Sequence, residues 1–195
     1  GPLLKEISAS AERLWQHLAW MHLHKKTISP HFKQPVAGDV KAAYVVRDNA
    51  LHRRDIEAAY LLAIRHAHQE IIICHAYFLP GIRWRRELTR AAKRGVRVVI
   101  LLQHRVEFWL LNHATRALYG NLLGAGIEIH EYHKSMMHSK VAVIDRHWAT
   151  VGSSNIDPFS LFLSREANLV VDNSEFAMSL HQDLEHALAH NAKQV

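Results

Sequence analysis

Two short, fully apolar runs constrain the fold of this chain most. Residues 71–74 and 98–102 are uninterrupted apolar stretches of strand length, and each follows a segment whose apolar residues recur at helical spacing. A strand with one face in water alternates apolar and polar residues, whereas a strand covered on both faces is apolar throughout. The runs therefore indicate an α/β fold with a mixed or parallel sheet that carries helices on both faces.

Strand-like and helix-like segments alternate through the rest of the chain. The predicted strands are Ala42–Val46, Glu70–Phe78, Val96–Leu102, Ile127–Tyr132, Lys140–Ile144, Trp148–Val151 and Ala167–Val171. The predicted helices of this region are Asp55–His68, Trp84–Arg94, Phe108–Leu123 and Glu175–His190.

The N-terminal part of the chain has a different organisation. Apolar residues at helical spacing predict an amphipathic helix over Leu3–Lys26, and Pro30, Pro35 and Gly38 then mark a linker. We expect three parts: a probable tag remnant at residues 1–2, the helix and linker at 3–39, and a compact domain at 40–195.

Composition excludes several classes of protein. No apolar run in the 195 residues approaches the roughly 18 needed for a membrane span, and one cysteine, Cys74, cannot make a disulfide framework. Cys74 lies inside an apolar run and is predicted to be a core residue. The formal net charge of +6 favours anionic partners, which include nucleic acid, phosphorylated metabolites and acidic membranes.

One stretch of sequence carries residue types suited to phosphate chemistry. On the predicted strand at 140–144, His138 and Lys140 point the same way, whereas Asp145 has the opposite parity. Ser153 and Asn155 share parity near the end of the next strand, where a hydroxyl and an amide can donate hydrogen bonds to phosphate oxygens.

These side chains suit the cleavage and formation of a phosphodiester. A neutral imidazole attacks phosphorus, the Lys140 ammonium stabilises charge on the non-bridging oxygens, and a second imidazole protonates the departing alkoxide. Glu166 is expected to reach an imidazole nitrogen and fix its tautomer. Such a mechanism needs no metal and no other cofactor.

The spacing of these residues resembles that of the phospholipase D superfamily. Its H-x-K-x4-D signature is matched by His138, Lys140 and Asp145, and a G-S-x-N extension begins at Gly152. Within the superfamily, the chain is most similar to the C-terminal half of bacterial cardiolipin synthases of the B type. Three segments carry that similarity: 77–81, 155–160 and 166–168.

The resemblance covers roughly residues 42–190 and implies both a fold and an activity. The fold is a phospholipase D-like α/β/α sandwich with a mixed, mainly parallel sheet. The activity is that of a phosphatidyltransferase that acts through a phosphohistidine. In this family pattern His138 and Lys140 engage phosphate, Asp145 is mainly structural, and Glu166 supports the histidine.

The chain departs from the family pattern at two points. Ser164 and Arg165 precede Glu166, where members of the group often carry Asn and an apolar residue, so hydrogen bonding beside the site is expected to differ. The family's active site also needs two motifs, and this chain contains one. We expect a homologous N-terminal half, or a second copy of this chain, to complete it.

The expected partners follow from this assignment. They are an anionic phospholipid substrate and a membrane surface, which imply a peripheral protein of the bacterial cytoplasmic membrane. The segment Asp157-Pro158 is typical of cardiolipin synthases and argues against nucleic acid as the substrate. Two alternatives stay open: a phosphodiesterase or nuclease with the same site, and a non-catalytic module that binds anionic lipid.

Three further segments have two interpretations each. Arginines 83, 86, 90, 94 and 97 recur at helical spacing, which predicts either a solvated face with Glu87 paired to a neighbour or a surface for phosphate-bearing headgroups or nucleic acid. For residues 108–111 we expect core packing in preference to contact with acyl chains. The N-terminal helix, with Trp15, suits either a lipid interface or an arm that packs on another part of the protein.

Overall fold

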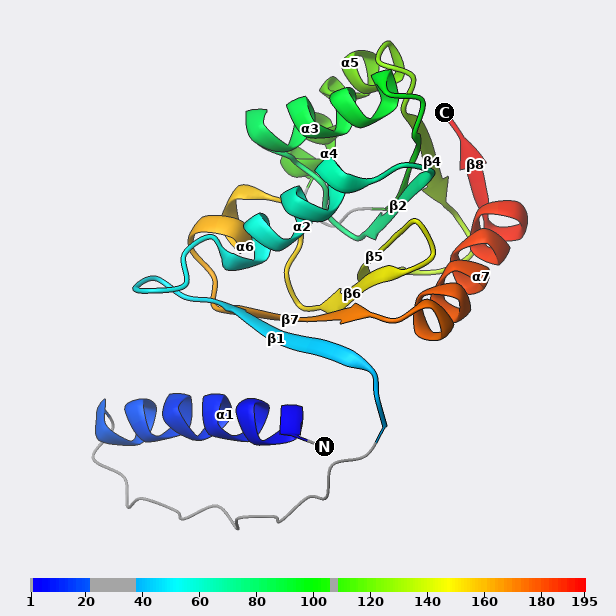
Figure 1. Ribbon diagram of the computed structural model, residues 1–195. Coiled ribbons are helices and arrows are strands. Elements are labelled where there is room, and N and C mark those ends of the chain that lie inside the picture. Colours follow the sequence, from blue (N-terminus) through cyan, green and yellow to red (C-terminus); the bar gives the residue numbers. More distant parts are fainter. Residues whose placement is uncertain (1, 22–37, 106–108) are drawn as a thin grey trace.

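The computed structural model describes residues 2–21, 38–105 and 109–195, and its core is an eight-stranded sheet (Figure 1). The strands are β1 (Lys41–Arg47), β2 (Glu70–His75), β3 (Arg97–Gln103), β4 (Glu128–Tyr132), β5 (Lys140–Ile144), β6 (Trp148–Gly152), β7 (Glu166–Asp172) and β8 (Ala192–Gln194). The helices are α1 (Pro2–Met21), α2 (Asp55–His66), α3 (Ile82–Lys93), α4 (Trp109–Ala117), α5 (Tyr119–Leu123), α6 (Pro158–Phe162) and α7 (Ser174–Asn191).

The sheet is mixed, as predicted, but the expectation that it is mainly parallel is wrong. Its strand order is β1-β7-β6-β5-β2-β3-β4-β8, and only the pairs β2–β3 and β3–β4 are parallel. The physical reason lies in the connections. Helices α3, α4 and α5 provide the long crossovers that parallel strands require, whereas short turns join β5 to β6, and short turns permit only antiparallel neighbours.

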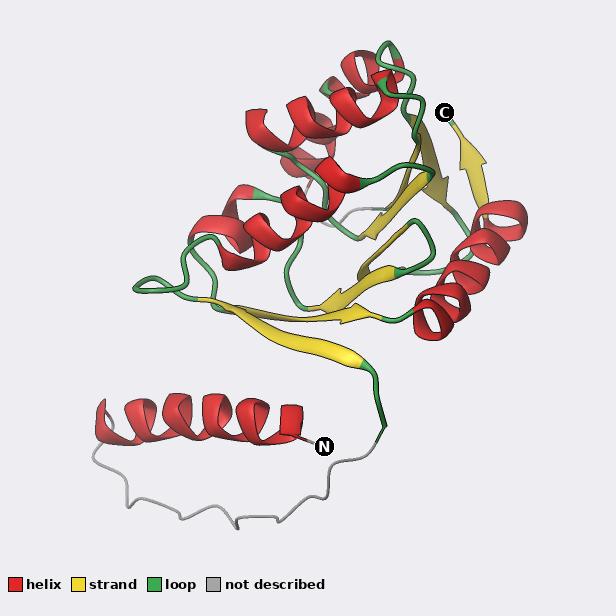
Figure 2. Ribbon diagram, in the orientation of Figure 1, coloured by secondary structure: helices red, strands yellow, loops and turns green. Residues whose placement is uncertain are grey.

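Helices cover both faces of the sheet, as the apolar runs predicted (Figure 2). Ile71 and Ile73 point to the face that packs under α2 and α3, where Tyr60, Trp84 and Leu88 are buried in the larger core cluster. Ile72 and Cys74 point to the other face, against Ala177, Leu184 and Leu188 of α7. Cys74 is 2% exposed, and burial raises the pKa of its thiol to about 12, so the prediction of a core cysteine is confirmed.

All seven strands predicted from the sequence are present, with boundaries that move by at most three residues. The long helix predicted at 108–123 is two shorter helices, α4 and α5, and two short elements, α6 and β8, were not predicted. The expected linker falls almost wholly at residues 22–37, which lie outside the described residues, as does Gly1. None of the described helices combines the length and the apolar character that crossing a bilayer requires.

Strand directions bring six loops to one edge of the sheet. Strands β1, β2, β3, β4 and β6 end at this edge, and β5 and β7 begin there. Loops 48–54, 76–81 and 133–139, together with 153–157, therefore meet around the start of β5, which is the position of the H-x-K motif. We call this side of the molecule the site edge.

Candidate active site

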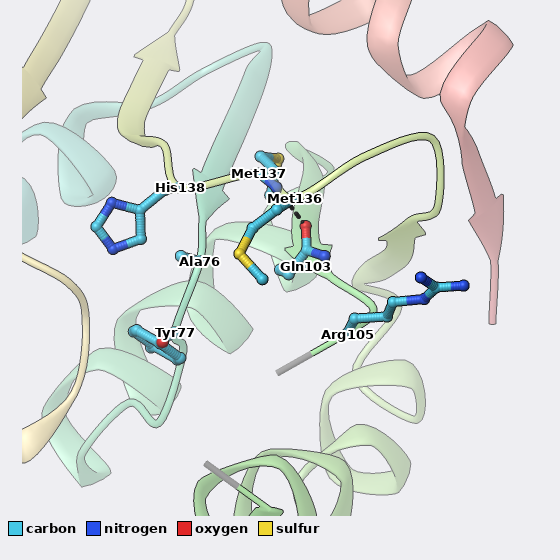
Figure 3. Close-up of a pocket in the computed structure, with 7 residues that line it drawn as sticks. All are labelled: Ala76, Tyr77, Gln103, Arg105, Met136, Met137 and His138. Atoms are coloured by element: carbon cyan, nitrogen blue, oxygen red, sulfur yellow. Dashed lines mark hydrogen bonds between the residues drawn. The ribbon is translucent and has the colours of Figure 1, made fainter. Parts of the chain in front are cut away.

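His138 lies at the site edge, two residues before β5 begins at Lys140, and its side chain is exposed. It lines a pocket of about 210 Å³, whose other walls come from the loop after β2, the end of β3 and the loop before β5 (Figure 3). The edge of its ring faces Tyr77, with 6.4 Å between the ring centroids. An exposed imidazole at the mouth of a pocket is accessible to a substrate.

Two hydrogen bonds from the end of β3 hold the loop that carries His138. The side chain of Gln103, at the end of β3, accepts a hydrogen bond from the backbone N–H of Met137 at 2.7 Å and donates to the Ser135 carbonyl at 3.4 Å. Figure 3 shows Gln103 beside Met136, with a dashed line to Met137. Strand β3 thus holds the loop that carries His138, although no functional residue was predicted on β3.

Lys140 stands behind His138 and is almost completely buried. Only 7% of the residue is exposed, and its ammonium donates to the His138 carbonyl at 2.9 Å. Burial lowers the pKa of Lys140, while the negative charges of Glu166 and Asp157 oppose that effect. An ammonium has three N–H donors, and one of those of Lys140 is used in this bond.

Ser153, directly after β6, and Glu166, the first residue of β7, bond each other. The sequence predicted that Ser153 would bind phosphate and that Glu166 would bind an imidazole. The Ser153 hydroxyl donates to the Glu166 carboxylate and accepts from the Ala167 backbone N–H at 3.1 Å. Among the described residues, no hydrogen bond joins Glu166 to His138. Glu166 therefore bonds the serine here, and its charge acts on Lys140.

Asn155 is also buried, at 8% exposure. Its side-chain oxygen accepts from the Tyr77 backbone N–H at 3.4 Å, and its amide nitrogen donates to none of the described residues. The role predicted for this amide, a hydrogen bond to a phosphate oxygen, stays a prediction. The adjoining Asp157 caps α6 by accepting from the backbone N–H groups of Phe159 and Ser160.

Asp145 lies at the opposite end of β5 from His138 and Lys140. Its carboxylate accepts three backbone N–H bonds, from His68, Gln69 and Glu70, at 2.8, 2.8 and 2.9 Å. It adopts a left-handed conformation, with φ 51°, in the turn between β5 and β6. These bonds join the turn to the start of β2, so Asp145, the third residue of the motif, stabilises the sheet and does not line the pocket.

A buried polar network lies directly beneath the site. Tyr60, His75, Thr150 and Asn168 are each at most 1% exposed, and His75 pairs with Lys140 across β2 and β5. The Tyr60 hydroxyl lies 3.2 Å from His75 Nε2, and the Asn168 amide donates to Thr150 Oγ1 at 3.2 Å. Burial, together with the Lys140 charge, lowers the pKa of His75 to about 3, so its imidazole is neutral.

Sequence reasoning missed His75 and Thr150 as part of the site's surroundings. A histidine that ends an otherwise apolar run was the available signal for His75, because a polar group in such a run needs a buried partner. Asn168 belongs to the similar segment 166–168 and received no role.

The structure bears on two of the three segments for which the sequence allowed two interpretations. Arginines surround a buried carboxylate of α3: Glu87 lies within 3.5 Å of the side chains of Arg86 and Arg90 on α3 and of Arg65 on α2. This matches a helix face paired with Glu87. The expectation of core packing at 108–111 is wrong for Trp109 and Leu110, which are 70% and 67% exposed, while Phe108 lies outside the described residues.

None of the described side chains that could together hold a metal ion lines this pocket. In the described part of the chain, two such groups exist: His104, Glu131 and His133, and Glu70, His181 and Glu185. All three carboxylates are already engaged by arginines: Glu131 by Arg116, and both Glu70 and Glu185 by Arg97. Neither group includes His138.

Known proteins resemble the chain in sequence and in fold. Residues 60–188 match a family described as the phospholipase D-like domain of cardiolipin synthase. Cardiolipin synthase B of Escherichia coli K12 is 38% identical over 204 residues, which cover 100% of this chain and 47% of that protein. The chain thus spans about half the length of this curated relative.

Two solved structures share the fold. One is the phospholipase D family member Nuc from Salmonella typhimurium, with a TM-score of 0.68, 21% identity, and coverage of 80% of this chain and 99% of the other. The second is phosphatidylserine synthase from Haemophilus influenzae, with a TM-score of 0.66, 11% identity, and coverage of 88% and 43%. The motif, the pocket behind it and these similarities lead to one conclusion: the chain belongs to the family of phospholipase D-like domains of cardiolipin synthases.

Proposed function

We propose that this chain is one half of a phosphatidyltransferase that makes cardiolipin, with His138 as one of its two reacting imidazoles. The observation that carries the proposal is an exposed His138 at the mouth of a pocket, backed by the buried ammonium of Lys140. A relative that is 38% identical over the whole chain is named cardiolipin synthase B, which supports the same substrate class.

The reaction proceeds in two displacements at phosphorus. In the first, an imidazole nitrogen attacks the phosphorus of a phospholipid, the bond from phosphorus to the headgroup oxygen breaks, and the second imidazole gives that oxygen a proton. In the second, the hydroxyl of an acceptor lipid such as phosphatidylglycerol loses its proton to that imidazole and attacks the phosphohistidine. The phosphorus–nitrogen bond breaks and cardiolipin is formed.

The other residues of the site stabilise charge and hold positions. The Lys140 ammonium and the Asn155 amide donate to the non-bridging oxygens, whose negative charge increases as phosphorus becomes five-coordinate. Glu166 holds Ser153 and adds negative charge near Lys140, which keeps that lysine protonated despite its burial. Asp145 maintains the sheet beneath. This chemistry uses no metal and no cofactor.

The second imidazole comes from outside this chain's motif. A homologous N-terminal half, or a second copy of the chain, supplies it, because the sequence contains a single H-x-K-x4-D motif. The protein acts as a peripheral enzyme at the bacterial cytoplasmic membrane, where both lipid substrates reside. Nucleic acid is not its substrate.

The test is lipid turnover by the full-length protein that contains this chain. His138→Ala should abolish conversion of labelled phosphatidylglycerol to cardiolipin, and Lys140→Met should lower it about 10²–10³-fold. Unfolding midpoints of both variants serve as the control for folding. Wild-type turnover by a folded His138→Ala protein would remove the histidine from the mechanism. Cleavage of DNA without lipid turnover would favour the nuclease, and lipid binding without either would favour a non-catalytic module.

A further inference from the structure

Exposed apolar side chains gather at the site edge of this domain. Among the described residues, seven large apolar side chains are more than 60% exposed, and every one lies in or beside a loop of that edge. We call them the apolar rim: Leu51, Ile82, Trp109, Leu110, Met136, Phe159 and Leu163. Less exposed apolar side chains occur on other parts of the molecule, but a concentration of the most exposed ones on one side marks an interaction surface.

Contacts between the loops hold the parts of the rim in place relative to one another. Asn49 donates to the Leu163 carbonyl at 3.2 Å, which joins the loop after β1 to α6. Phe78 forms an isolated parallel β-bridge with Ile156. The Thr115 hydroxyl of α4 donates to the Phe78 carbonyl at 2.8 Å. The loops that carry Leu163, Ile82 and Trp109 are thereby held together, and Met136 lines the pocket between them and His138.

The charges interspersed with the rim are mostly positive. Among the described residues of the loops at this edge, the exposed charged side chains are those of Arg53, Arg54, Arg105, Lys134 and Arg165. Two carboxylates lie in the same loops: Asp157 is 3% exposed, and the half-buried Asp48 accepts from the backbone N–H groups of Ala50 and His52. Arg54 lies 3.9 Å from the Glu57 carboxylate, so the excess positive charge comes mainly from the other four side chains. Apolar side chains among these cations fit a surface that is apolar inside and anionic outside.

We propose that the site edge docks on a bilayer containing anionic phospholipids, with the apolar rim inserted among the headgroups and the cations on lipid phosphates. His138 then opens directly onto the plane of the phosphates, so a lipid reaches the pocket without leaving the membrane. The proposal rests on the proposed function for the identity of the substrate, but the docking itself is measured without turnover.

Two other surfaces are less suited to this role. The arginines of α3 have a carboxylate partner in Glu87, which is 3% exposed and lies within 3.4 Å of Arg86. Helix α1 carries a 55% exposed Trp15, yet it packs beside β1, on the far side of the sheet order from β2 and the pocket (Figure 1). A lipid bound at either surface would lie away from His138.

The first experiment compares two matched double variants of this 195-residue chain in co-sedimentation with vesicles. Phe159→Ser with Met136→Ser removes two rim side chains; Phe176→Ser with Met178→Ser makes the same changes at exposed positions of α7, beyond the opposite edge. On vesicles of phosphatidylcholine with phosphatidylglycerol, the rim variant should bind at least about tenfold more weakly, which is about 1.4 kcal/mol. The α7 variant should bind like the unaltered chain, and vesicles without phosphatidylglycerol should bind the unaltered chain weakly.

The second experiment locates the inserted side chain by fluorescence. Trp109→Phe keeps the rim apolar, so binding should persist while the blue shift that vesicles induce in tryptophan emission largely disappears. Trp15→Phe should leave that shift intact. Loss of the shift in Trp15→Phe and its retention in Trp109→Phe would make α1 the docking element and overturn the proposal.

Two further outcomes would also overturn it. One is equal vesicle binding by the rim variant and the unaltered chain. The other is a rim variant that loses self-association in sedimentation velocity while vesicle binding is unchanged, since the rim would then be covered by a second copy. Turnover of lipid dispersed in detergent is recorded separately, so that a chain that docks but does not react would contradict the proposed function alone.

Discussion

Gly152 is the residue with the least room for a side chain near the site. A Cβ atom built there would lie 2.1 Å from the Asn168 side-chain oxygen and 2.6 Å from the Ala167 carbonyl oxygen. Since the second contact is to backbone, β6 and β7 would have to separate. Gly152→Ala should therefore lower the free energy of unfolding by about 1–3 kcal/mol. Gly120→Ala, which meets nothing within 4 Å, is the control, and equal stability of the two variants in chemical denaturation would contradict the close approach.

The lowered pKa of His75 predicts how the free energy of unfolding depends on pH. Its pKa is about 3 in the folded chain and 6.5 when solvated, so the unfolded chain binds a proton that the folded one does not. This contribution is complete above pH 6.5 and is lost as pH falls towards 3, by up to about 1.4 kcal/mol per pH unit. His75→Gln should be less stable than the unaltered chain at neutral pH, and the difference should shrink on acidification. His66→Gln, at an exposed position on α2, is the control; a difference that stays constant with pH would contradict a neutral buried imidazole.

At the scale of elements, the turn between β5 and β6 depends on one carboxylate. Asp145 joins that turn to the start of β2 through three backbone N–H groups, and both Asp145 and Arg146 have positive φ. Asp145→Ala should lower the free energy of unfolding by about 1.5–3 kcal/mol, because it removes a charged acceptor. Asp145→Asn keeps one oxygen and tolerates the left-handed conformation, so it should be affected less.

The same pair of variants separates structure from chemistry at Asp145. Because the carboxylate lies at the far end of β5 from His138, folded Asp145→Asn should retain turnover in the full-length protein. Loss of turnover by a variant with the unfolding midpoint of the unaltered chain would assign Asp145 a part in the reaction.

Most elements of this fold follow from local sequence, and the exceptions have physical causes. Continuous apolar runs predicted β2 and β3 because both faces of those strands are covered. The helix α6 was missed because its five residues begin at Pro158 within a turn-like sequence, and the Asp157 cap has no distinct signal at that length. Parallel or antiparallel pairing depends on where β5 inserts in the sheet, which local patterns do not specify.

Sequence patterns predicted where the candidate site residues lie, but not which hydrogen bonds they make. Residues 138, 140, 153, 155 and 166 do meet at one edge, because strand parity and the strand ends bring them there. The bond from Ser153 to Glu166 and the burial of His75 beside Lys140 arise from contacts between strands distant in sequence. No spacing within one strand encodes such contacts.

At the scale of the whole molecule, the proposed reaction needs two imidazoles, and the single motif of this chain supplies one. His138 is exposed on a surface where apolar side chains and cations also gather, so under the two proposals above a lipid surface and a second motif share the site edge. The rim extends from Leu51 to Trp109 across several loops, whereas the reacting groups lie at its centre near Lys140. A second motif that faces His138 across the pocket would leave the outer part of the rim for the bilayer.

This arrangement predicts how activity varies with concentration. One H-x-K-x4-D motif supplies a nucleophile or an acid but not both, so the 195-residue chain should be inactive as a monomer. If two copies associate about a two-fold axis with their His138 side chains facing each other, weak cleavage of a soluble phosphodiester should appear and fall on dilution as the dimer dissociates. Sedimentation velocity and activity are measured over the same concentration range, with His138→Ala as the control that keeps the association and lacks the activity. Strong turnover by a demonstrated monomer would mean that a second acid lies within this chain, and the view of it as half an active site would be wrong.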